Sequence, residues 1–163
     1  MKLSPTYKMQ FKRRKEGKTD YQNRLKMLKS GRPRLVVRKS LRYITAQVIE
    51  FTPKGDKTLV SATSKELKKL GWKFAMDNLP AAYLTGMIIA KKCKEKKISQ
   101  AILDSGLYAS TKGNRIYAVV KGAVDGGLKI PVSQEILPSE DRISGRHIGK
   151  SLPETFESVR SKI

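Results

Sequence analysis

The chain contains little cysteine and little histidine. Of its 163 residues one is a cysteine, Cys93, and one is a histidine, His147. A single cysteine excludes an internal disulfide, and together with a single histidine it excludes a zinc site built from those two residue types. The sequence therefore predicts a protein of a reducing compartment without structural metal or another cofactor.

Long apolar runs are also absent. The longest run without a charged residue, residues 78–90, spans 13 positions, whereas a membrane-spanning helix needs about 20. The first residues, MKLSPTYKMQF, lack the apolar stretch of a secretion signal. A hydrophobic content of 39% is nevertheless too high for a wholly disordered basic tail. We expect a soluble protein with one folded body of modest size.

Acidic residues are scarce, and the basic excess is concentrated near the N-terminus. The chain has 35 Lys and Arg against 14 Asp and Glu, a formal net charge of +21. Residues 1–42 hold 15 of the basic residues, and their acids are Glu16 and Asp20 alone. A chain this basic repels itself unless it meets a polyanion. The partner classes left open are nucleic acid, an anionic membrane surface and an acidic protein.

The N-terminal region divides into an arm and a helix. Residues 1–18 show no sustained apolar period and are predicted to be extended. A helix should follow with Thr19 as its N-cap. Tyr21, Leu25 and Leu28 fall at helical spacing, which predicts an apolar stripe docked on the folded body.

The middle of the chain predicts a mixed sheet. Three β-rich segments are separated by short connections, which favour an antiparallel meander: residues 34–39, 43–51 and 57–63. Two helices should follow, a short one capped by Thr63 and Glu66 and a longer one from about Pro80 to Lys96. The strand predicted at 98–105 comes after a helix, so it should pair in parallel.

Three parts of the chain are predicted. They are a basic arm (1–18), an α/β domain (19–132) and a C-terminal extension (133–163). Within the second part, a further helix at 115–124 and a short strand near 128–132 complete an α/β fold whose mixed sheet is covered by helices. The extension is polar and Gly-bearing, looks less like core, and ends in a short helix that begins at Ser151.

Two sets of residues have the side chains that commonly contact nucleic acid. The arm carries the run 12–15, KRRK, and arginine forks match phosphate groups bidentately. Tyr7, Phe11 and Tyr21 lie among these cations and can stack on unpaired bases, although Tyr21 alternatively staples the helix to the sheet. The second set lies at the corner between helix and sheet and comprises Arg32, Arg34, Arg38, Lys39 and Arg42. Arg34 and Arg38 are an even number of residues apart, so their side chains should lie on the same face of the strand and make that face cationic.

Catalytic patterns are poor. Asp104 and Glu50 are the two candidate carboxylates for a metal-dependent nuclease, and a two-metal site needs more. Asp104 is better explained as a cap of the loop after it. The segment STKGN lacks the glycine order of a phosphate-binding loop, and Cys93 is best explained as a small core residue. The sequence does not predict an enzyme.

The segments RRKEGKTDYQNRLKMLKSGRPRLVVRKS, AQVIEF and LVSATS closely resemble a known family. It is the archaeal form of large-subunit ribosomal protein number eighteen, whose eukaryotic counterpart is number five. The resemblance continues through AAYLTGMIIAKKCKEKKI, AILDSGLYASTKGNRIYAVVKGAVDGGL and IPVSQEILPSEDRISGRHI, and so covers nearly the whole chain.

The resemblance implies a ribonuclease-H-like ribosomal fold and a structural role in the cytoplasmic ribosome. The implied partners are 5S rRNA, large-subunit rRNA and neighbouring proteins of the central protuberance, with no membrane and no small-molecule substrate. The arm, RPRLVVRKS and the loop 108–115 would lie on RNA. The predicted RNA-binding residues are Lys8, Lys12, Arg13, Arg14, Lys15, Lys18, Tyr21, Arg24, Arg32, Arg34, Arg38, Lys39, Ser40, Arg42, Tyr108, Lys112, Asn114, Arg115, Arg146 and His147. The alternatives are a generic basic module that binds any nucleic acid and a metal-dependent nuclease.

Overall fold

Four strands form a mixed sheet in the part of the chain that the computed structural model describes, residues 5–149 and 151–163. The strand order is β3-β2-β1-β4. The strands are β1 (Arg34–Lys39), β2 (Ile44–Thr52), β3 (Gly55–Thr63) and β4 (Ile102–Asp104). The pairs β1–β2 and β2–β3 are antiparallel, and β1–β4 is parallel. The predicted fold class, a meander extended by one parallel strand, is confirmed.

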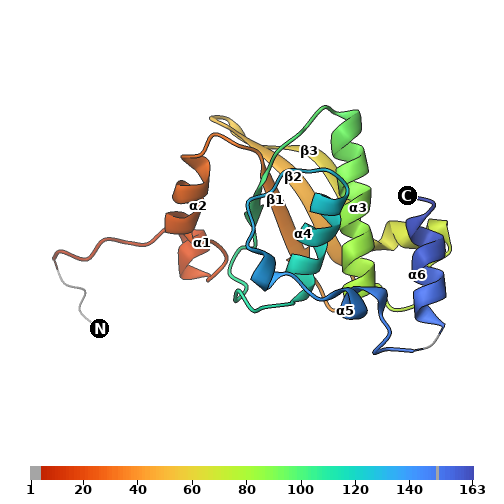
Figure 1. The fold of residues 1–163 in the computed structure, drawn as a ribbon. Helices are drawn as coiled ribbons and strands as arrows, with labels where there is room; N and C mark the ends of the chain where they lie inside the picture. Colours follow the sequence, from red (N-terminus) through yellow and green to blue (C-terminus); the bar gives the residue numbers. More distant parts are fainter. Residues whose placement is uncertain (1–4, 150) are drawn as a thin grey trace.

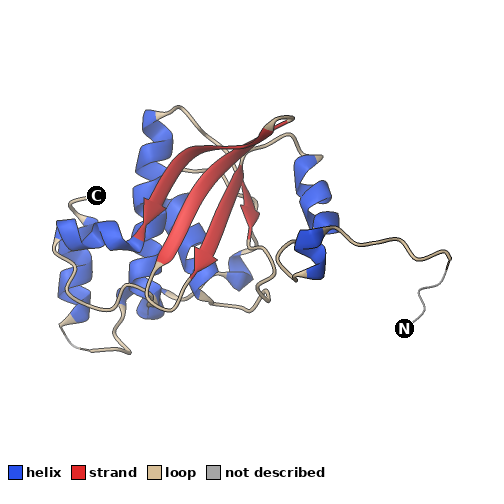
Figure 2. Ribbon diagram, turned by 180° about the vertical axis from the view of Figure 1, so that it is seen from behind, coloured by secondary structure: helices blue, strands red, loops and turns tan. Residues whose placement is uncertain are grey.

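Helices cover one face of this sheet. The α-helices are α1 (Lys12–Lys15), α2 (Tyr21–Leu28), α3 (Leu79–Glu95), α4 (Arg115–Asp125), α5 (Glu140–Ser144) and α6 (Leu152–Arg160), and the 3-10 helices are η1 (Ser64–Leu70) and η2 (Gln134–Ile136). α3 and α4 lie side by side against the sheet (Figure 1). No helix of the described residues crosses the opposite face, and α1 and α2 stand beside it (Figure 2).

Polar side chains begin η1 and α3 where the sequence predicts them. Thr63 and Glu66 form a capping box for η1, and Gly71 ends that helix with a positive φ of 96°. Asn78 caps α3, its side chain accepting a hydrogen bond from the Ala81 N–H at 2.9 Å. Each cap satisfies a backbone donor that a helix start leaves without a partner. These short-range signals therefore place η1 and α3 correctly.

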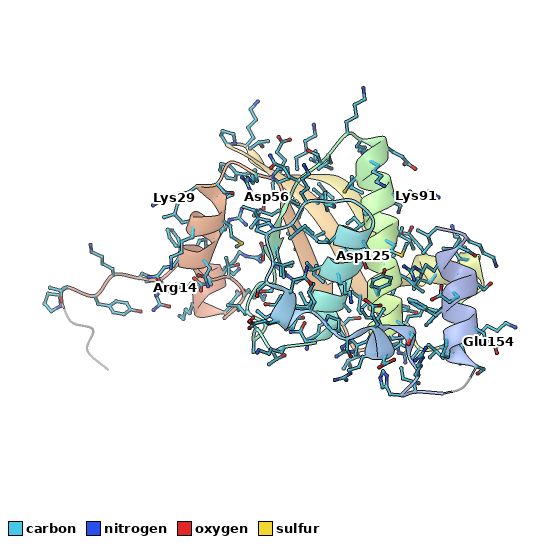
Figure 3. The ribbon with its side chains drawn as sticks, in the orientation of Figure 1. Arg14, Lys29, Asp56, Lys91, Asp125 and Glu154 are labelled. Carbon is cyan, nitrogen blue, oxygen red and sulfur yellow. The ribbon has the colours of Figure 1, made fainter. Side chains whose placement is uncertain are left out.

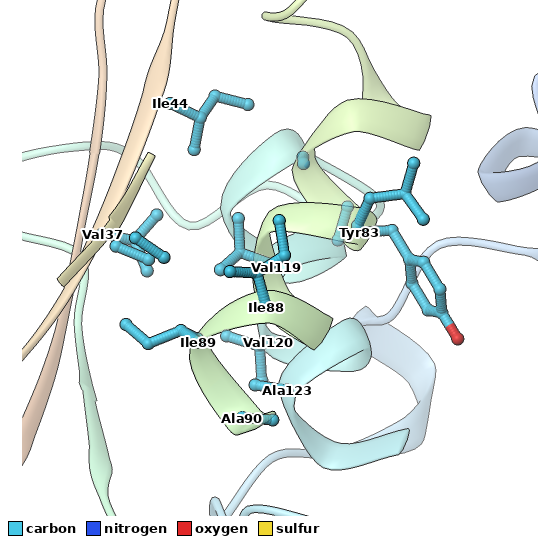
Figure 4. Close-up of a cluster of buried hydrophobic side chains, with 14 of the residues drawn as sticks. Val37, Ile44, Tyr83, Ile88, Ile89, Ala90, Val119, Val120 and Ala123 are labelled. Carbon is cyan, nitrogen blue, oxygen red and sulfur yellow. The ribbon is translucent and has the colours of Figure 1, made fainter. Parts of the chain in front are cut away.

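The core lies between the sheet and the α3–α4 pair. Leu35 and Val37 of β1 are fully buried, as their parity predicts. Valines and isoleucines of α3 and α4 face the strand side chains (Figure 4). The two helices approach closely because each carries a glycine at the contact. A Cβ at Gly86 would lie 2.1 Å from the Val119 carbonyl oxygen, and one at Gly122 would lie 2.0 Å from the Tyr83 carbonyl oxygen.

The N-terminal predictions need three corrections. The arm is not extended throughout, because Lys12–Lys15 forms the short helix α1. Asp20, rather than Thr19, is the N-cap of α2, and its carboxylate accepts hydrogen bonds from the backbone of residues 22 and 23. The predicted apolar stripe is not docked on the body either, since α2 has no buried residue and Leu25 is 57% exposed.

The C-terminal predictions also need correction. Instead of a strand at 128–132, the structure has one isolated parallel bridge between Gln100 and Lys129. The segment after 133 contributes four side chains to the hydrophobic core, Ile143, Leu152, Phe156 and Val159. α6, the helix predicted after Ser151, lies beside α3 (Figure 1), and the rings of Phe156 and Tyr83 are 5.7 Å apart. These side chains are buried because α5 and α6 pack on α3, which is distant in sequence. The polar composition of the segment does not indicate this burial.

Candidate nucleic-acid interface

The arm and α1 carry an exposed cluster of cations. All side chains of α1 are exposed, and its first turn holds no acid. Arg13 donates from Nε to the Thr19 hydroxyl oxygen at 2.9 Å, which fixes the arm's turn toward α2. Lys18 pairs locally with Glu16 at 2.9 Å. The other cations in the described part of the arm, residues 5–18, are Lys8, Lys12, Arg14 and Lys15, and they are exposed.

Aromatic contact ties the arm to α2. The rings of Phe11 and Tyr21 lie 5.1 Å apart at a tilted angle, which is a favourable aromatic geometry. Tyr21 therefore packs α2 against the arm, whereas the sequence interpretation offered stacking on a base or packing of the helix on the sheet. Phe11 remains 71% exposed, and Tyr7 is also exposed. Both rings keep a face on which an unpaired base can stack.

Five side chains form a chain of alternating charges between α2 and the sheet. We call it the charge chain, and it runs Arg24–Asp56–Arg34–Asp104–Arg38. Arg24 Nη2 donates to both carboxylate oxygens of Asp56, at 2.8 and 2.9 Å. Arg34 donates to Asp56 at 2.8 Å and to Asp104 at 2.7 Å, and Arg38 donates to Asp104 at 3.0 Å. The charge chain thereby links α2, β3, β1 and β4.

The charge chain corrects the sequence interpretation of β1. Arg34 is only 2% exposed, so its charge is committed to two carboxylates rather than presented to a partner. The face expected to be cationic also carries Asp56 and Asp104, which β-pairing brings to Arg34 from distant positions. Arg38 keeps an exposed guanidinium on the same face. Asp104 also accepts from the Gly106 N–H at 2.9 Å, as its predicted role of loop cap requires.

The electrostatics of Asp56 follow from its partners. Burial alone would raise the pKa of this carboxyl, but hydrogen bonds from Arg24 and Arg34, together with their positive charges, outweigh burial and lower the pKa below its ordinary value of 3.8. Asp56 lies between α2 and the strands (Figure 3). A cleft of about 180 Å³ opens beside it, and its cationic lining comprises Arg13, Lys18, Arg24, Arg34 and Arg38.

A second group of predicted residues gathers at the other end of β1. Lys39 lies over the ring of Tyr108 at 5.0 Å, and the Tyr108 hydroxyl donates to the Lys39 carbonyl oxygen at 2.8 Å. The Ser40 hydroxyl accepts from the backbone of residues 42 and 43, which shapes the β1–β2 turn. Arg42 is exposed on that turn. The predicted loop and the predicted strand are thus adjacent in space.

A hollow of about 390 Å³ lies beside Lys39, and we call it the end pocket. The N-caps of α3 and α4, Asn78 and Asn114, both line it, so two helix N-termini with their partial positive charges face it. Arg115 also lines it and pairs with Asp77 at 2.9 Å. Arg142 adds a further cation to the lining, and His147 also lines the hollow.

The end pocket includes a cation that the sequence interpretation missed. Arg142 belongs to α5 in a segment assigned to a polar extension, and no local pattern connects it to Lys39 or Arg115. Lys112, which is exposed, and Arg146, which pairs with Asp141 at 3.0 Å, do not line the end pocket. The other predicted residues at this end that lie outside its lining are Ser40, Arg42 and Tyr108. Arg32 is exposed ahead of β1 and lines neither hollow.

The described side chains do not assemble a catalytic centre. Asp104 is saturated by two arginines and a backbone donor, and Glu50 is exposed on β2. Among residues 5–149 and 151–163, no three His, Cys, Asp or Glu side chains are grouped as metal ligands. Cys93 is fully buried, and burial raises the pKa of its thiol to about 11, so it is inert core. None of the described helices has the length and apolar character that crossing a bilayer requires.

These features define a strongly basic α/β protein with two hollows lined by cations. The chain matches the family model described as "Ribosomal large subunit proteins 60S L5, and 50S L18" over residues 5–100 and 91–133. It is 53% identical to "Large ribosomal subunit protein uL18" of Korarchaeum cryptofilum over 99% of this chain and 82% of the relative. It is 54% identical to the protein of that name of Caldivirga maquilingensis over 92% of this chain and 73% of the relative. The chain belongs to this family of large-subunit ribosomal proteins, which is not enzymatic.

Proposed function

We propose that the chain binds 5S rRNA and anchors it in the central protuberance of the large ribosomal subunit in the cytoplasm. The observation that carries the proposal is the exposed cation cluster of the arm and α1, held next to α2 and the cleft. The N-terminal helices stand beside the open face of the sheet (Figure 2), so RNA bound to the arm would lie near that face.

The binding mechanism follows from the shape of RNA. A-form helices hide their major groove, so side chains contact phosphates and 2′-hydroxyls and stack on bases that are splayed from loops. Lys12, Arg14 and Lys15 supply phosphate contacts, and Phe11 and Tyr7 supply stacking surfaces. The end pocket supplies a separate cationic contact for a second RNA segment, either of 5S rRNA or of the large-subunit rRNA. Neighbouring proteins of the protuberance would cover the remaining surface.

Equilibrium binding of the purified chain to 5S rRNA tests this proposal, with transfer RNA and duplex DNA as competitors near physiological salt. A strong preference for 5S rRNA that is weakened by deletion of residues 1–18 is the expected result. Equal binding to all three nucleic acids would refute the proposal and leave a generic basic module. Because electrostatic affinity falls steeply with salt, all three titrations must share one salt concentration.

A further inference from the structure

We propose that Asp56 is a positioning residue for RNA binding: its carboxylate holds α2, and with it the arm, against the sheet. An acid would thereby raise the affinity of a strongly basic chain for a polyanion. The binding test of this inference rests on the proposed function. Its structural test uses the free protein and needs no RNA.

Apolar packing of α2 is limited. The helix has no fully buried residue: Leu25 is 57% exposed, and the side chains at positions 27 and 28 are half-buried. The aromatic contact between Phe11 and Tyr21 joins α2 to the arm and not to the sheet. Among the described residues, the Arg24–Asp56 pair is the one side-chain hydrogen-bonded link between α2 and a strand. Loss of that pair should therefore release α2 and the arm together.

The sheet side of the link is rigid. Asp56 accepts from the buried guanidinium of Arg34, which Asp104 holds from the other side. Arg34 Nε is buried and has no hydrogen-bond partner among the described residues, so the two carboxylates alone orient the guanidinium. The buried Arg34 therefore fixes the position of the Asp56 carboxylate, and the carboxylate in turn fixes the guanidinium of Arg24.

The helix side of the link leaves Arg24 able to bind RNA. Both hydrogen bonds to Asp56 use a single guanidinium nitrogen, Nη2. An arginine has five N–H donors, so those of Nη1 and Nε remain for a phosphate. Arg24 lines the cleft beside Arg13 and Lys18. The carboxylate therefore orients a cation toward the same cleft in which the arm's cations lie.

Charge alone predicts the opposite effect. Removing an acid from a chain of net charge +21 increases its attraction for a polyanion. Positioning predicts weaker binding, because the fraction of molecules with α2 in place falls and the apparent affinity falls with it. The two explanations differ in sign, so a neutral substitution separates them.

The experiment compares Asp56→Asn with Glu50→Gln in the full chain. Both changes remove one negative charge from the β2–β3 hairpin, but Glu50 is exposed and makes no ion pair with the described residues. A partly exposed ion pair contributes modestly, so we expect Asp56→Asn to bind 5S rRNA about two- to fivefold more weakly than the parent. Glu50→Gln should bind equally well or more tightly. Asp56→Asn binding as tightly as Glu50→Gln would overturn the proposal.

Hydrogen exchange of the free chain gives an RNA-independent readout. In Asp56→Asn the amides of α2 should lose protection while β1 and α3 keep theirs, and Glu50→Gln should change neither. Arg24→Gln, which breaks the same pair without touching Arg34, should reproduce the loss in α2. Unchanged protection of α2 in both pair-breaking variants would overturn the inference. Loss of protection without any preference for 5S rRNA would instead refute the proposed function alone.

Discussion

The close crossing of α3 and α4 can be tested by substituting Gly122 with alanine. A Cβ at this position would lie 2.0 Å from the carbonyl oxygen of Tyr83 and 2.9 Å from its carbonyl carbon. Real Cβ atoms essentially never lie within 3.0 Å of such neighbours, and both atoms belong to helix backbone that no rotamer change can move away. The two helices must therefore separate by about 1 Å.

The expected cost follows from that displacement. Overpacking a core costs about 1–3 kcal/mol, and a backbone clash belongs at the upper end. Alanine regains about 1 kcal/mol of helix propensity relative to glycine. The net loss is then about 2 kcal/mol, which lowers the melting temperature of a chain of this size by roughly 4–8 °C. The same displacement would move the helix N-termini that line the end pocket.

Urea unfolding is the appropriate assay, followed by circular dichroism and by the fluorescence of Trp72, which is the sole tryptophan and is buried. Gly149→Ala is the matched control, because a Cβ there meets nothing within 4 Å, and its stability should stay within about 0.5 kcal/mol of the parent. If Gly122→Ala unfolds at the same urea concentration as the parent, the two glycines do not set the helix spacing.

Four further predictions concern the arm, the C-terminal helix, the charge chain and the thiol. Replacing Arg13 and Arg14 with alanine should reduce the slope of log binding constant against log salt concentration by roughly one to two, at about 0.7–0.9 per phosphate contact. An unchanged slope in titrations at several salt concentrations would refute phosphate binding by these arginines. Phe156→Ala should destabilise the fold by about 3–5 kcal/mol in urea unfolding, because the ring is buried against α3; a loss under 1 kcal/mol would mean that α6 is not part of the core. The lowered pKa of Asp56 stabilises the fold above its ordinary value of 3.8, and this contribution is lost as the pH falls through the folded value. Melting curves between pH 2 and 5 should therefore fall less steeply for Asp56→Asn, and identical slopes would contradict the assignment. Cys93 should resist a thiol reagent at about pH 8 until the chain unfolds, because burial raises its pKa to about 11; rapid labelling of the native protein would contradict its burial.

Local sequence signals determined much of the fold. The strand predicted at 34–39 has the bounds of β1, and α3 begins where Asn78 and the following Pro80 place it. Both results depend on neighbouring residues only: alternation along a strand, and a cap that satisfies a helix's first backbone donors. The basic excess of the arm is likewise a property of composition, so the expectation of a polyanionic partner needed no coordinates.

Tertiary structure decided which cations are available. Arg34 and Arg38 share a parity on β1, yet one is buried in two ion pairs and the other remains partly exposed. The partners of Arg34 come from positions 22 and 70 residues away, brought together by antiparallel and parallel pairing. No local pattern carries that information, because burial depends on what the rest of the chain places over a side chain.

The same division holds at the two ends of the chain. The sequence by itself determined that residues 21–28 and 152–160 are helical, because helical periodicity and caps are local. Only the tertiary structure decided that the first helix rests on an ion pair while the second buries Leu152 and Phe156 in the core. Helix formation is set by residues within a few positions of each other, whereas docking is set by the surface that distant segments offer. An apolar stripe predicts burial only where such a surface exists.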